Sequence, residues 1–448
     1  MMKALSKILL LLLLAVVCLP GRGQAWSQNS QGQMPASSRQ LIAIKVVGSK
    51  HFPEEAIAAA TGLQMGTVVG DDDFKKAARR LGDTGAFTDI AYTFSYSSAG
   101  TKLEVHVTDV DKFVPARFED FVWFTDAEIR RRIKEHVPLF DGQLPLSGRM
   151  PDEVSDVLQA MLVENAIPGH VDYLRVGKPD GPIESIDYKV SEVLIRVRNI
   201  EFTGAGEAEL PALQAAAERL PERQYSRSRL DLLVQRQLLP VYFSRGYLKA
   251  SFSEPQPKTV KDADSIEEGS RNQSVVDVAF AVTPGVQYKL KSIEWSGNHA
   301  FPTDRLQGMV HVEPGKPANT IRLGENLRDI QTLYSSRGFL KATIKVDAQM
   351  DDAAATVAFH LEVKEDVVYH MGDLEFRGLD NSLTAKLRGL WKIRQGEVYD
   401  ATYLSEYLPE ALKLLPPSLD WDVSQHVTAN VREKTVDVDL IYSVKAPK

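Results

Sequence analysis

Two strings of nine residues decide the fold, YFSRGYLKA at Tyr242–Ala250 and YSSRGFLKA at Tyr334–Ala342. Each follows a stretch with apolar residues at three- and four-residue spacing, which predicts a helix with one buried face. Gly246 and Gly338 fit the left-handed residue that closes such a helix, and the arginine before each glycine then faces the negative end of the helix dipole. A ligand-gripping role for these arginines is the alternative, but no second polar group stands beside them.

After each glycine the apolar period changes from helical to two. The run Phe339–Val346 alternates apolar and polar residues, with Lys341, Thr343 and Lys345 on the polar face. This alternation predicts a half-buried strand. The two strings therefore mark the same helix-to-strand transition in two copies of one repeat.

The repeats also share an opening pattern. An apolar residue is followed two places on by another, and two places later by a glycine, which is the spacing of a strand that ends in a turn. The pattern occurs at Ile44/Val46/Gly48, Ile200/Phe202/Gly204, Ile293/Trp295/Gly297 and Leu374/Phe376/Gly378. The first two glycines are 156 residues apart, about two units, so we expect one further repeat between them. It begins near Arg117–Phe121, lacks the glycine, and continues with a helix over Asp126–His136.

Two helices and two strands are expected after each opening. Short first helices start at Phe52-Pro53 and Phe301-Pro302, with proline at the first helical position. The second helices, recognised by their amphipathic period, are expected at Asp72–Leu81, Glu153–Val163, Ser228–Phe243, Gly324–Ser335 and Tyr403–Leu415. Closing strands of period two are expected around 103–107, 186–190, 276–282, 357–363 and 436–442. Each repeat therefore reads strand, helix, helix, strand, strand.

At this point the residues resemble a known family. The succession Val282-Thr283-Pro284-Gly285, Tyr288–Ile293, Gly297-Asn298 with Phe301, and then the Arg-Gly-Phe string is similar to a POTRA domain, the polypeptide-transport-associated domain of outer-membrane assembly and translocation proteins. The similarity is strong for the first, third and fourth repeats. The second has no opening glycine, and the fifth replaces the helix-to-strand glycine with Leu415-Pro416-Pro417.

The resemblance implies an α+β fold of five tandem POTRA-like β-α-α-β-β repeats, each a three-stranded mixed sheet with two helices on one face. The expected domains are a signal peptide at 1–25, a flexible lead-in at 26–40, and repeats at 41–110, 111–192, 193–284, 285–366 and 367–448. In the third repeat the segment Glu254–Ser274 has prolines, mixed charges and no apolar period. We expect a long loop there.

The first 25 residues predict export. Lys3 and Lys7 precede an apolar run at Ile8–Leu19, and Gly23-Gln24-Ala25 offers small residues for cleavage. The run is shorter than the roughly 20 residues of a membrane span. Retention as an anchor and lipidation at Cys18 remain alternatives. Since Cys18 is the single cysteine, the cleaved chain has no thiol for disulfides or catalysis.

Composition and motifs argue against several classes of function. The net charge is -7, which argues against nucleic acid as a partner. The nine histidines show no metal spacing, and no nucleophile elbow or phosphate loop occurs, so we expect no metal, no cofactor and no enzymatic activity. Asp71-Asp72-Asp73 could suggest a cation site, but helix capping explains three carboxylates at a helix start.

The resemblance implies a function in the periplasm, associated with the outer membrane. We expect a non-enzymatic scaffold for outer-membrane protein assembly or polypeptide translocation that binds unfolded or nascent outer-membrane proteins by strand addition. The fifth repeat extends almost to Lys448, so we expect a separate outer-membrane barrel protein as partner, and possible peripheral membrane association. The alternative is a structural, divisome-like protein anchored in the inner membrane. A degradative or wall-modifying enzyme is a third hypothesis.

The resemblance also places the second strand of each repeat at a sheet edge, where a client strand could dock. The expected docking residues in the fourth repeat are Phe339, Leu340, Lys341, Ala342, Thr343, Ile344, Lys345 and Val346. In the third repeat they are Tyr247, Leu248, Lys249 and Ala250.

Overall fold

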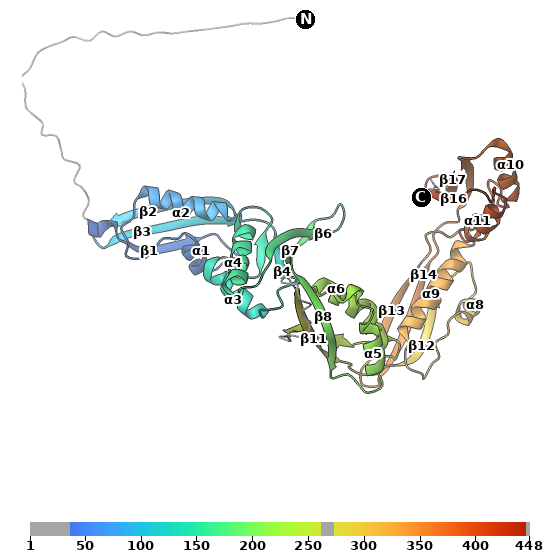
Figure 1. Ribbon diagram of the computed structural model, residues 1–448, viewed down its shortest axis with the longest axis horizontal. Helices are drawn as coiled ribbons and strands as arrows, with labels where there is room; N and C mark the ends of the chain where they lie inside the picture. Colours follow the sequence, from blue (N-terminus) through green and yellow to red (C-terminus); the bar gives the residue numbers. More distant parts are fainter. Residues whose placement is uncertain (1–35, 261–272, 445–448) are drawn as a thin grey trace, which may run out of the picture. The chain divides into compact units, whose positions relative to one another are not determined.

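The computed structural model describes residues 36–260 and 273–444 (Figure 1). The predicted signal peptide, most of the lead-in, and residues 261–272 of the predicted loop lie outside the described residues. The described residues divide into two compact units, the first within Met1–Lys112 together with Pro145–Met150, and the second within Phe113–Leu144 and Pro151–Lys448. Five sheets, numbered here in chain order, make up the framework.

The first sheet belongs to the first unit. After the short helix η1 (Ala36–Arg39) come β1 (Leu41–Val47), α1 (Glu54–Ala60), α2 (Asp71–Asp83), β2 (Phe87–Ser97) and β3 (Gly100–Asp109). The strand order is β1-β3-β2, with β1 parallel and β2 antiparallel to β3. The last strand therefore lies in the middle, and both other strands are edges.

The second and third sheets have four strands each. The second follows the chain as β4 (Phe113–Phe118), α3 (Asp126–His136), β5 (Gln143–Pro145), α4 (Met150–Glu164), β6 (His170–Gly177) and β7 (Ile183–Ser191), in the order β5-β4-β7-β6. The third is built from β8 (Leu194–Thr203), α5 (Leu210–Ala217), η2 (Pro221–Arg223), α6 (Arg227–Leu233), η3 (Val234–Leu238), α7 (Leu239–Phe243), β9 (Ser251–Phe252), β10 (Gln256–Thr259) and β11 (Gln273–Thr283). Its order is β10-β11-β8, and β9 also pairs with β11.

The fourth and fifth sheets repeat the topology of the first. The fourth holds β12 (Lys289–Ser296), α8 (Thr303–Gly308), α9 (Thr320–Ser335), β13 (Thr343–Asp351) and β14 (Thr356–Lys364), ordered β12-β14-β13. The fifth holds β15 (His370–Arg377), α10 (Asn381–Leu390), α11 (Tyr403–Lys413), β16 (Trp421–Asn430) and β17 (Thr435–Val444), ordered β15-β17-β16.

The predicted mixed α+β architecture is confirmed, with differences in the second and third sheets. The second sheet gains the short strand β5 between its two helices. In the third, the second edge strand is split into β9 and β10 around Ser253–Pro255, because proline at 255 has no N–H to continue a ladder. β10 and the start of β11 also lie inside the segment 254–274 that the sequence predicts to be a loop.

Three prolines change the helices from the prediction. The helix expected over Ser228–Phe243 contains the five-residue π segment η3, directly before the turn that holds Pro240. Proline lacks an N–H and crowds the carbonyl four residues back, and a wider turn relieves both problems. Pro53 and Pro302 stand one position earlier than expected, as extended residues that precede α1 and α8.

Alternate residues of each central strand and one face of the helices form the core. In the fourth sheet the buried residues of β14 are Val357, Phe359, Leu361 and Val363. They share one apolar cluster with α9 side chains that include Leu323, Ile330 and Tyr334. The helices therefore cover this face of the sheet, and the intervening strand residues face away from them.

Gly246 and Gly338 do more than end a helix. The backbone φ angles are +85° and +83°, the left-handed region that glycine enters without a Cβ clash. The carbonyl of Gly246 accepts a hydrogen bond from Tyr288 N at 2.8 Å, and that of Gly338 accepts one from Tyr369 N at 2.8 Å. Each glycine therefore binds the residue that leads into the next sheet.

Gly338→Ala tests whether the close approach or the backbone angle matters more. A Cβ at 338 would lie 2.8 Å from the Tyr369 carbonyl oxygen, whereas a Cβ at Gly315, which has the same φ of +83°, would meet nothing within 4 Å. We expect Gly315→Ala to lower the free energy of unfolding by about 1–2 kcal/mol from the backbone angle alone. Gly338→Ala should cost about 1–3 kcal/mol more because of overpacking.

Urea unfolding followed by tryptophan fluorescence measures both variants. Equal losses for the two substitutions would show that the contact with Tyr369 contributes nothing.

Candidate functional site

Half of the residues expected to form a docking edge in the fourth repeat are not in a strand. β13 begins at Thr343, so Phe339–Ala342 precede it, and Tyr247–Ala250 precede β9 in the same way. Their backbone bonds are local, because Leu340 N donates to Gly338 O and Ala342 N donates to Phe339 O. The turn that starts at the glycine continues for four residues before a ladder can form. Thr343, Ile344, Lys345 and Val346 do belong to β13.

The side chains of these turns join consecutive sheets. Tyr247 packs against the core of the third sheet and Leu248 against the core of the fourth. Phe339 likewise packs against the fourth core, and Leu340 against the fifth. The alternation in the strings therefore reflects a division between two cores. The prediction that the strand starts at Phe339 is wrong, because Phe339–Ala342 form a turn.

The lysine of each string lies over the tyrosine that starts the next sheet. Lys249 Nζ is 5.7 Å from the ring centre of Tyr288, and it contacts both carboxylate oxygens of Asp352 at 2.8 and 2.7 Å. Tyr288 donates to the same carboxylate at 2.5 Å. These hydrogen bonds, that of Lys249 first, hold the pKa of Asp352 below its usual range.

The equivalent position in the fifth sheet lacks the carboxylate. Lys341 Nζ is 6.0 Å from the ring centre of Tyr369, which resembles the position of Lys249 over Tyr288 in the joint between the third and fourth sheets. Ala355 O accepts a hydrogen bond from Lys289 N, and Lys434 O accepts the equivalent bond from His370 N. Val431 precedes its acceptor by three residues, as Asp352 does, so Val431 occupies the equivalent position. The Tyr369 hydroxyl is buried without a hydrogen-bond partner among the described residues. Among the residues that the structure describes, the fourth-to-fifth joint therefore has no counterpart of the ion pair.

A buried polar cluster joins the second and third sheets. Glu119 is buried and accepts hydrogen bonds from Ser228 N at 2.9 Å and Ser228 Oγ at 2.8 Å. Arg227 pairs with Asp126, with one contact of 2.9 Å. Beside them, burial and the neighbouring Glu119 raise the pKa of Asp120 to about 7, and one of its carboxylate oxygens has no hydrogen-bond partner among the described residues.

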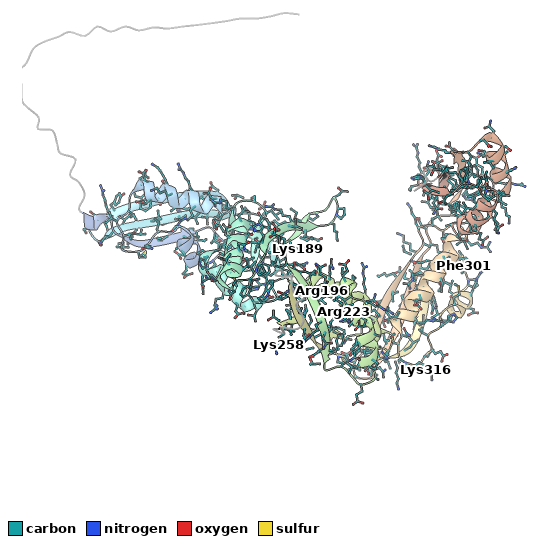
Figure 2. The ribbon with its side chains drawn as sticks, viewed as in Figure 1. Lys189, Arg196, Arg223, Lys258, Phe301 and Lys316 are labelled. Carbon is teal, nitrogen blue, oxygen red and sulfur yellow. The ribbon has the colours of Figure 1, made fainter. Side chains whose placement is uncertain are left out.

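The first strand of four of the sheets is a closed edge. β1, β12 and β15 each carry a β-bulge close to the start, at Ile42, Lys291 and Gly372-Asp373, and β8 carries one in its middle, at Arg198. The turn after the first helix also crosses the start of each strand. In the fourth sheet the Lys316 carbonyl (labelled in Figure 2) accepts from Leu290 N at 2.8 Å. Bulges and covering turns hinder the pairing of a further strand.

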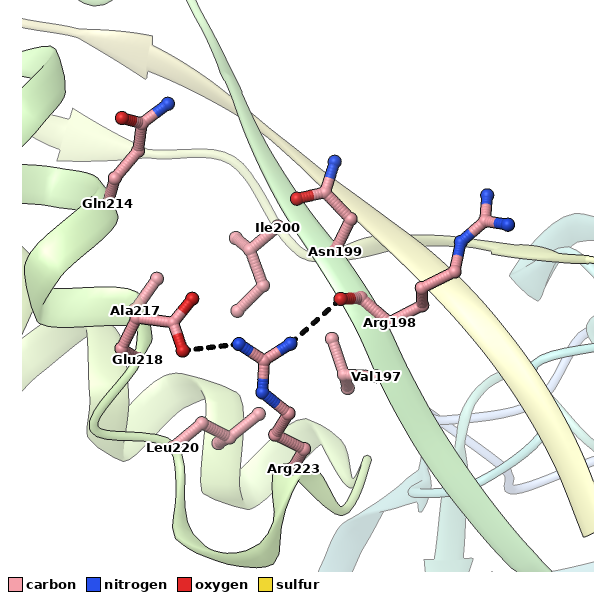
Figure 3. Close-up of a pocket in the computed structure, with 9 residues that line it drawn as sticks. All are labelled: Val197, Arg198, Asn199, Ile200, Gln214, Ala217, Glu218, Leu220 and Arg223. Atoms are coloured by element: carbon pink, nitrogen blue, oxygen red, sulfur yellow. Dashed lines mark hydrogen bonds and ion pairs between the residues drawn. The ribbon is translucent and has the colours of Figure 1, made fainter. Parts of the chain in front are cut away.

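In the third sheet an arginine closes the same edge (Figure 3). Arg223 Nη1 donates to the Arg198 carbonyl at 2.9 Å, and Nη2 pairs with Glu218. A pocket of about 270 Å³ surrounds the guanidinium between β8 and α5. Glu222 and Arg223 have φ angles of +53° and +48°, where the equivalent turns of other sheets have glycine. The strained turn therefore holds the Arg223 guanidinium against the Arg198 carbonyl, which an added strand would need as a hydrogen-bond acceptor.

The opposite edges are more open. β13 and β16 pair with the central strands without any bulge, and β2 has one shift, at its start between Phe87 and Asp89. In the third sheet, Pro257 lies within the edge strand β10 and has no N–H to donate. β6, the edge of the second sheet, is also free of proline and has one shift, at its end between Val176 and Gly177. Regular, proline-free edges are therefore found on β2, β6, β13 and β16.

β13 has a strip of apolar residues on the helix-covered side of its sheet. Val346 and Met350 pair with the buried Leu361 and Val357, so they share the core-facing side. They are nevertheless 44% and 42% exposed. An added strand with apolar residues at alternate positions would cover this strip while its backbone paired with the edge.

Comparisons with known proteins identify this part of the chain. The family model described as "POTRA: Surface antigen variable number repeat" matches residues 288–366. The chain carries a POTRA domain. This domain contains Tyr288, the fourth sheet, β13 and Asp352, and it ends before β15.

Two curated relatives and one solved structure are similar over longer stretches. A Treponema pallidum (strain Nichols) protein named as an outer membrane protein assembly factor is 24% identical over 39% of this chain. The outer membrane protein assembly factor BamA of Buchnera aphidicola (subsp. Acyrthosiphon pisum, strain APS) is 22% identical over 46%. The chain spans 20% and 31% of the length of these relatives. The structure of POTRA domains 3 to 5 of Haemophilus influenzae BamA covers 56% of this chain and 97% of its own, with 21% identity and a TM-score of 0.43.

Outside the POTRA domain, the acidic triplet of α2 has structural partners. Asp73 accepts a hydrogen bond from Gly70 N at 2.9 Å, and Asp71 contacts Lys75 Nζ at 2.5 Å. Within 36–260 and 273–444, no three His, Cys, Asp or Glu side chains are placed to hold a metal ion. Over the same residues, no helix combines the length and the apolar character needed to cross a membrane.

The partly buried Asp120 predicts a pH dependence of stability. Its pKa rises from an ordinary 3.8 to about 7 in the folded protein, so the folded state binds more protons than the unfolded state between these values. The contribution of Asp120 to stability is therefore present below about pH 4 and is lost as the pH rises through about 7. Asp120→Asn should raise the free energy of unfolding at pH 8 by roughly 1–3 kcal/mol relative to its effect at pH 4.

Thermal or urea unfolding at both pH values checks this, with Asp347→Asn on the exposed face of β13 as the matched control. The same effect of Asp120→Asn at both pH values would refute the shifted pKa.

Proposed function

We propose that this chain is a non-enzymatic scaffold for outer-membrane protein assembly or polypeptide translocation, and that it binds extended client segments as added strands. The observation that carries the proposal is β13 of the POTRA domain, a nine-residue edge without bulge or proline whose core-facing side is partly exposed. The two relatives named as assembly factors support the biological setting.

The chemistry of such an edge suits clients that are not yet folded. An unpaired strand offers backbone N–H and C=O groups, which any extended chain can satisfy. Selection by side chain is then limited to the apolar strip of Val346, Ala348 and Met350 on one side. On the other side, Lys345 and Asp347 are exposed and tolerate polar partners. The edge should therefore accept many sequences that alternate apolar and polar residues.

Binding at one edge should be weak. Four or five backbone hydrogen bonds contribute roughly 0.5–1.5 kcal/mol each, while association costs about 4–15 kcal/mol. Covering the remaining exposed surface of Val346 and Met350 adds a modest apolar term. Dissociation constants in the high micromolar range follow, and several edges acting on one client would supply the useful affinity.

We propose that the clients are unfolded or nascent outer-membrane proteins and that a separate outer-membrane barrel protein is the partner. The expected location is the periplasm, peripherally associated with the outer membrane. The names of the relatives and the predicted export signal support this placement. The boundaries of the five repeats, as given from the sequence, remain part of this proposal.

A pair of proline substitutions tests β13 directly. Successive N–H groups of a strand point to opposite sides, so of Asp347→Pro and Ala348→Pro one removes a bond to β14 and the other removes an outward donor. The first should unfold the POTRA domain, and the second should leave it folded with weaker client binding. The measurement is the shift of the Met350 methyl signal on titration with a ten-residue peptide of alternating valine and threonine.

The thermal unfolding curve identifies which of the two variants is folded, and the other proline variant is the matched control. If the folded variant and the unaltered chain bind the peptide equally well, docking at β13 is wrong.

A further inference from the structure

Three of the regular edges, β2, β13 and β16, present equivalent positions with different side chains. The carbonyls of Val107, Val363 and Tyr442 lie against the turn glycines Gly48, Gly297 and Gly378, which aligns the three central strands. Opposite them on the edge strands are Ile90, Ile344 and Val423. The next three core-facing positions are Tyr92, Phe94 and Tyr96 on β2, Val346, Ala348 and Met350 on β13, and Gln425, Val427 and Ala429 on β16.

On β2 these positions form a row of rings. The ring centres of Tyr92 and Phe94 are 6.5 Å apart, and those of Phe94 and Tyr96 are 5.3 Å apart. Phe74 of α2 is buried behind them, 4.9 Å from Phe94. Tyr92 also reaches Asp71 at the start of α2. The rings are therefore held from the helix side, while Phe94 is still 37% exposed.

The opposite faces of the edges differ in charge. On β2 the outward residues Ala91, Thr93 and Ser95 are exposed and uncharged. On β13 the corresponding face carries Lys345 and Asp347. Side chains of neighbouring strands lie about 5 Å apart. The outward residues of a strand added to β2 would therefore lie next to uncharged residues, which favours uncharged residues in that strand.

We propose that β2 is a second docking edge, selective for extended polypeptide segments that carry aromatic side chains at alternate positions with small uncharged residues between them. An extended segment can pair with the open backbone groups of the edge, and aromatic side chains at alternate positions add ring-to-ring contacts with the row of three rings that aliphatic side chains do not make. β13 takes segments with aliphatic residues at the same positions. This inference rests on the proposed function, since it assigns different client segments to different edges.

The test uses the full chain and two peptides that differ only at alternate positions. One peptide alternates phenylalanine with threonine and serine, and the other alternates valine with the same polar residues. The δ1 methyl groups of Ile90 and Ile344 occupy equivalent positions and report binding at β2 and β13. We expect the aromatic peptide to bind at β2 about tenfold more tightly than the valine peptide, with no such preference at β13.

A strip exchange supplies the matched variant. Tyr92→Val/Phe94→Ala/Tyr96→Met gives β2 the residues of β13 and should abolish the tenfold preference at Ile90 while leaving Ile344 unchanged. If the triple variant fails to fold, Phe94→Leu removes only the most exposed ring and should reduce the preference.

Equal binding of both peptides at both edges overturns this inference and leaves strand docking in place. Absence of binding at β2, with binding retained at β13, overturns the inference alone, whereas absence of binding at both edges overturns the proposed function as well. Preference for the aromatic peptide at β13 rather than β2 also overturns the inference.

Discussion

Each joint around Gly246 and Gly338 must end a helix, return the chain to its own core and receive the next sheet within five residues. The positive φ ends the helix, and the aromatic residue after the glycine turns back into the first core. The glycine carbonyl binds the tyrosine amide of the next sheet, with no room for a Cβ. Without this constraint, neither the start of β13 nor the position of Lys249 over Tyr288 would be fixed.

The same topology makes the two edges of a sheet unequal. The first strand must accept the crossing turn after the first helix, and the bulge beside it redirects the strand so that this turn can pair with it. The second strand does not have to pair with a crossing turn, because it is joined to the central strand by a hairpin. It can therefore run in register for nine or ten residues. The proposed docking suits this edge because the closed edge has already used its backbone groups locally.

Much of this organisation could be predicted from the sequence. The amphipathic periods place α3 and α11 almost to the residue, and the opening glycines mark where first strands end. The alternation at 339–342 predicted a strand wrongly, because residues that divide between two cores give the same sequence pattern as residues on two faces of a strand. The row of Tyr92, Phe94 and Tyr96 was visible as an alternating pattern, but its exposure depends on how far α2 reaches over the sheet. Bulges have no comparable sequence signal here, since Ile42, Arg198 and Lys291 share no residue type.

The contrast between Asp352 and Val431 shows how one position changes the character of a joint. In the third-to-fourth joint, lysine and tyrosine converge on a carboxylate, so both donors are satisfied. In the fourth-to-fifth joint the Tyr369 hydroxyl is buried without a partner in the described chain, which costs about 1–3 kcal/mol. The fifth sheet is then held to the POTRA domain by Leu340, by the glycine bond, by the Ala401 N–H that donates to the Ser335 carbonyl at 3.2 Å, and by Lys341 over the Tyr369 ring. Since an edge strand gains avidity only when its neighbours can reach the same client, a joint without the ion pair favours adjustment between β13 and β16 over a fixed spacing.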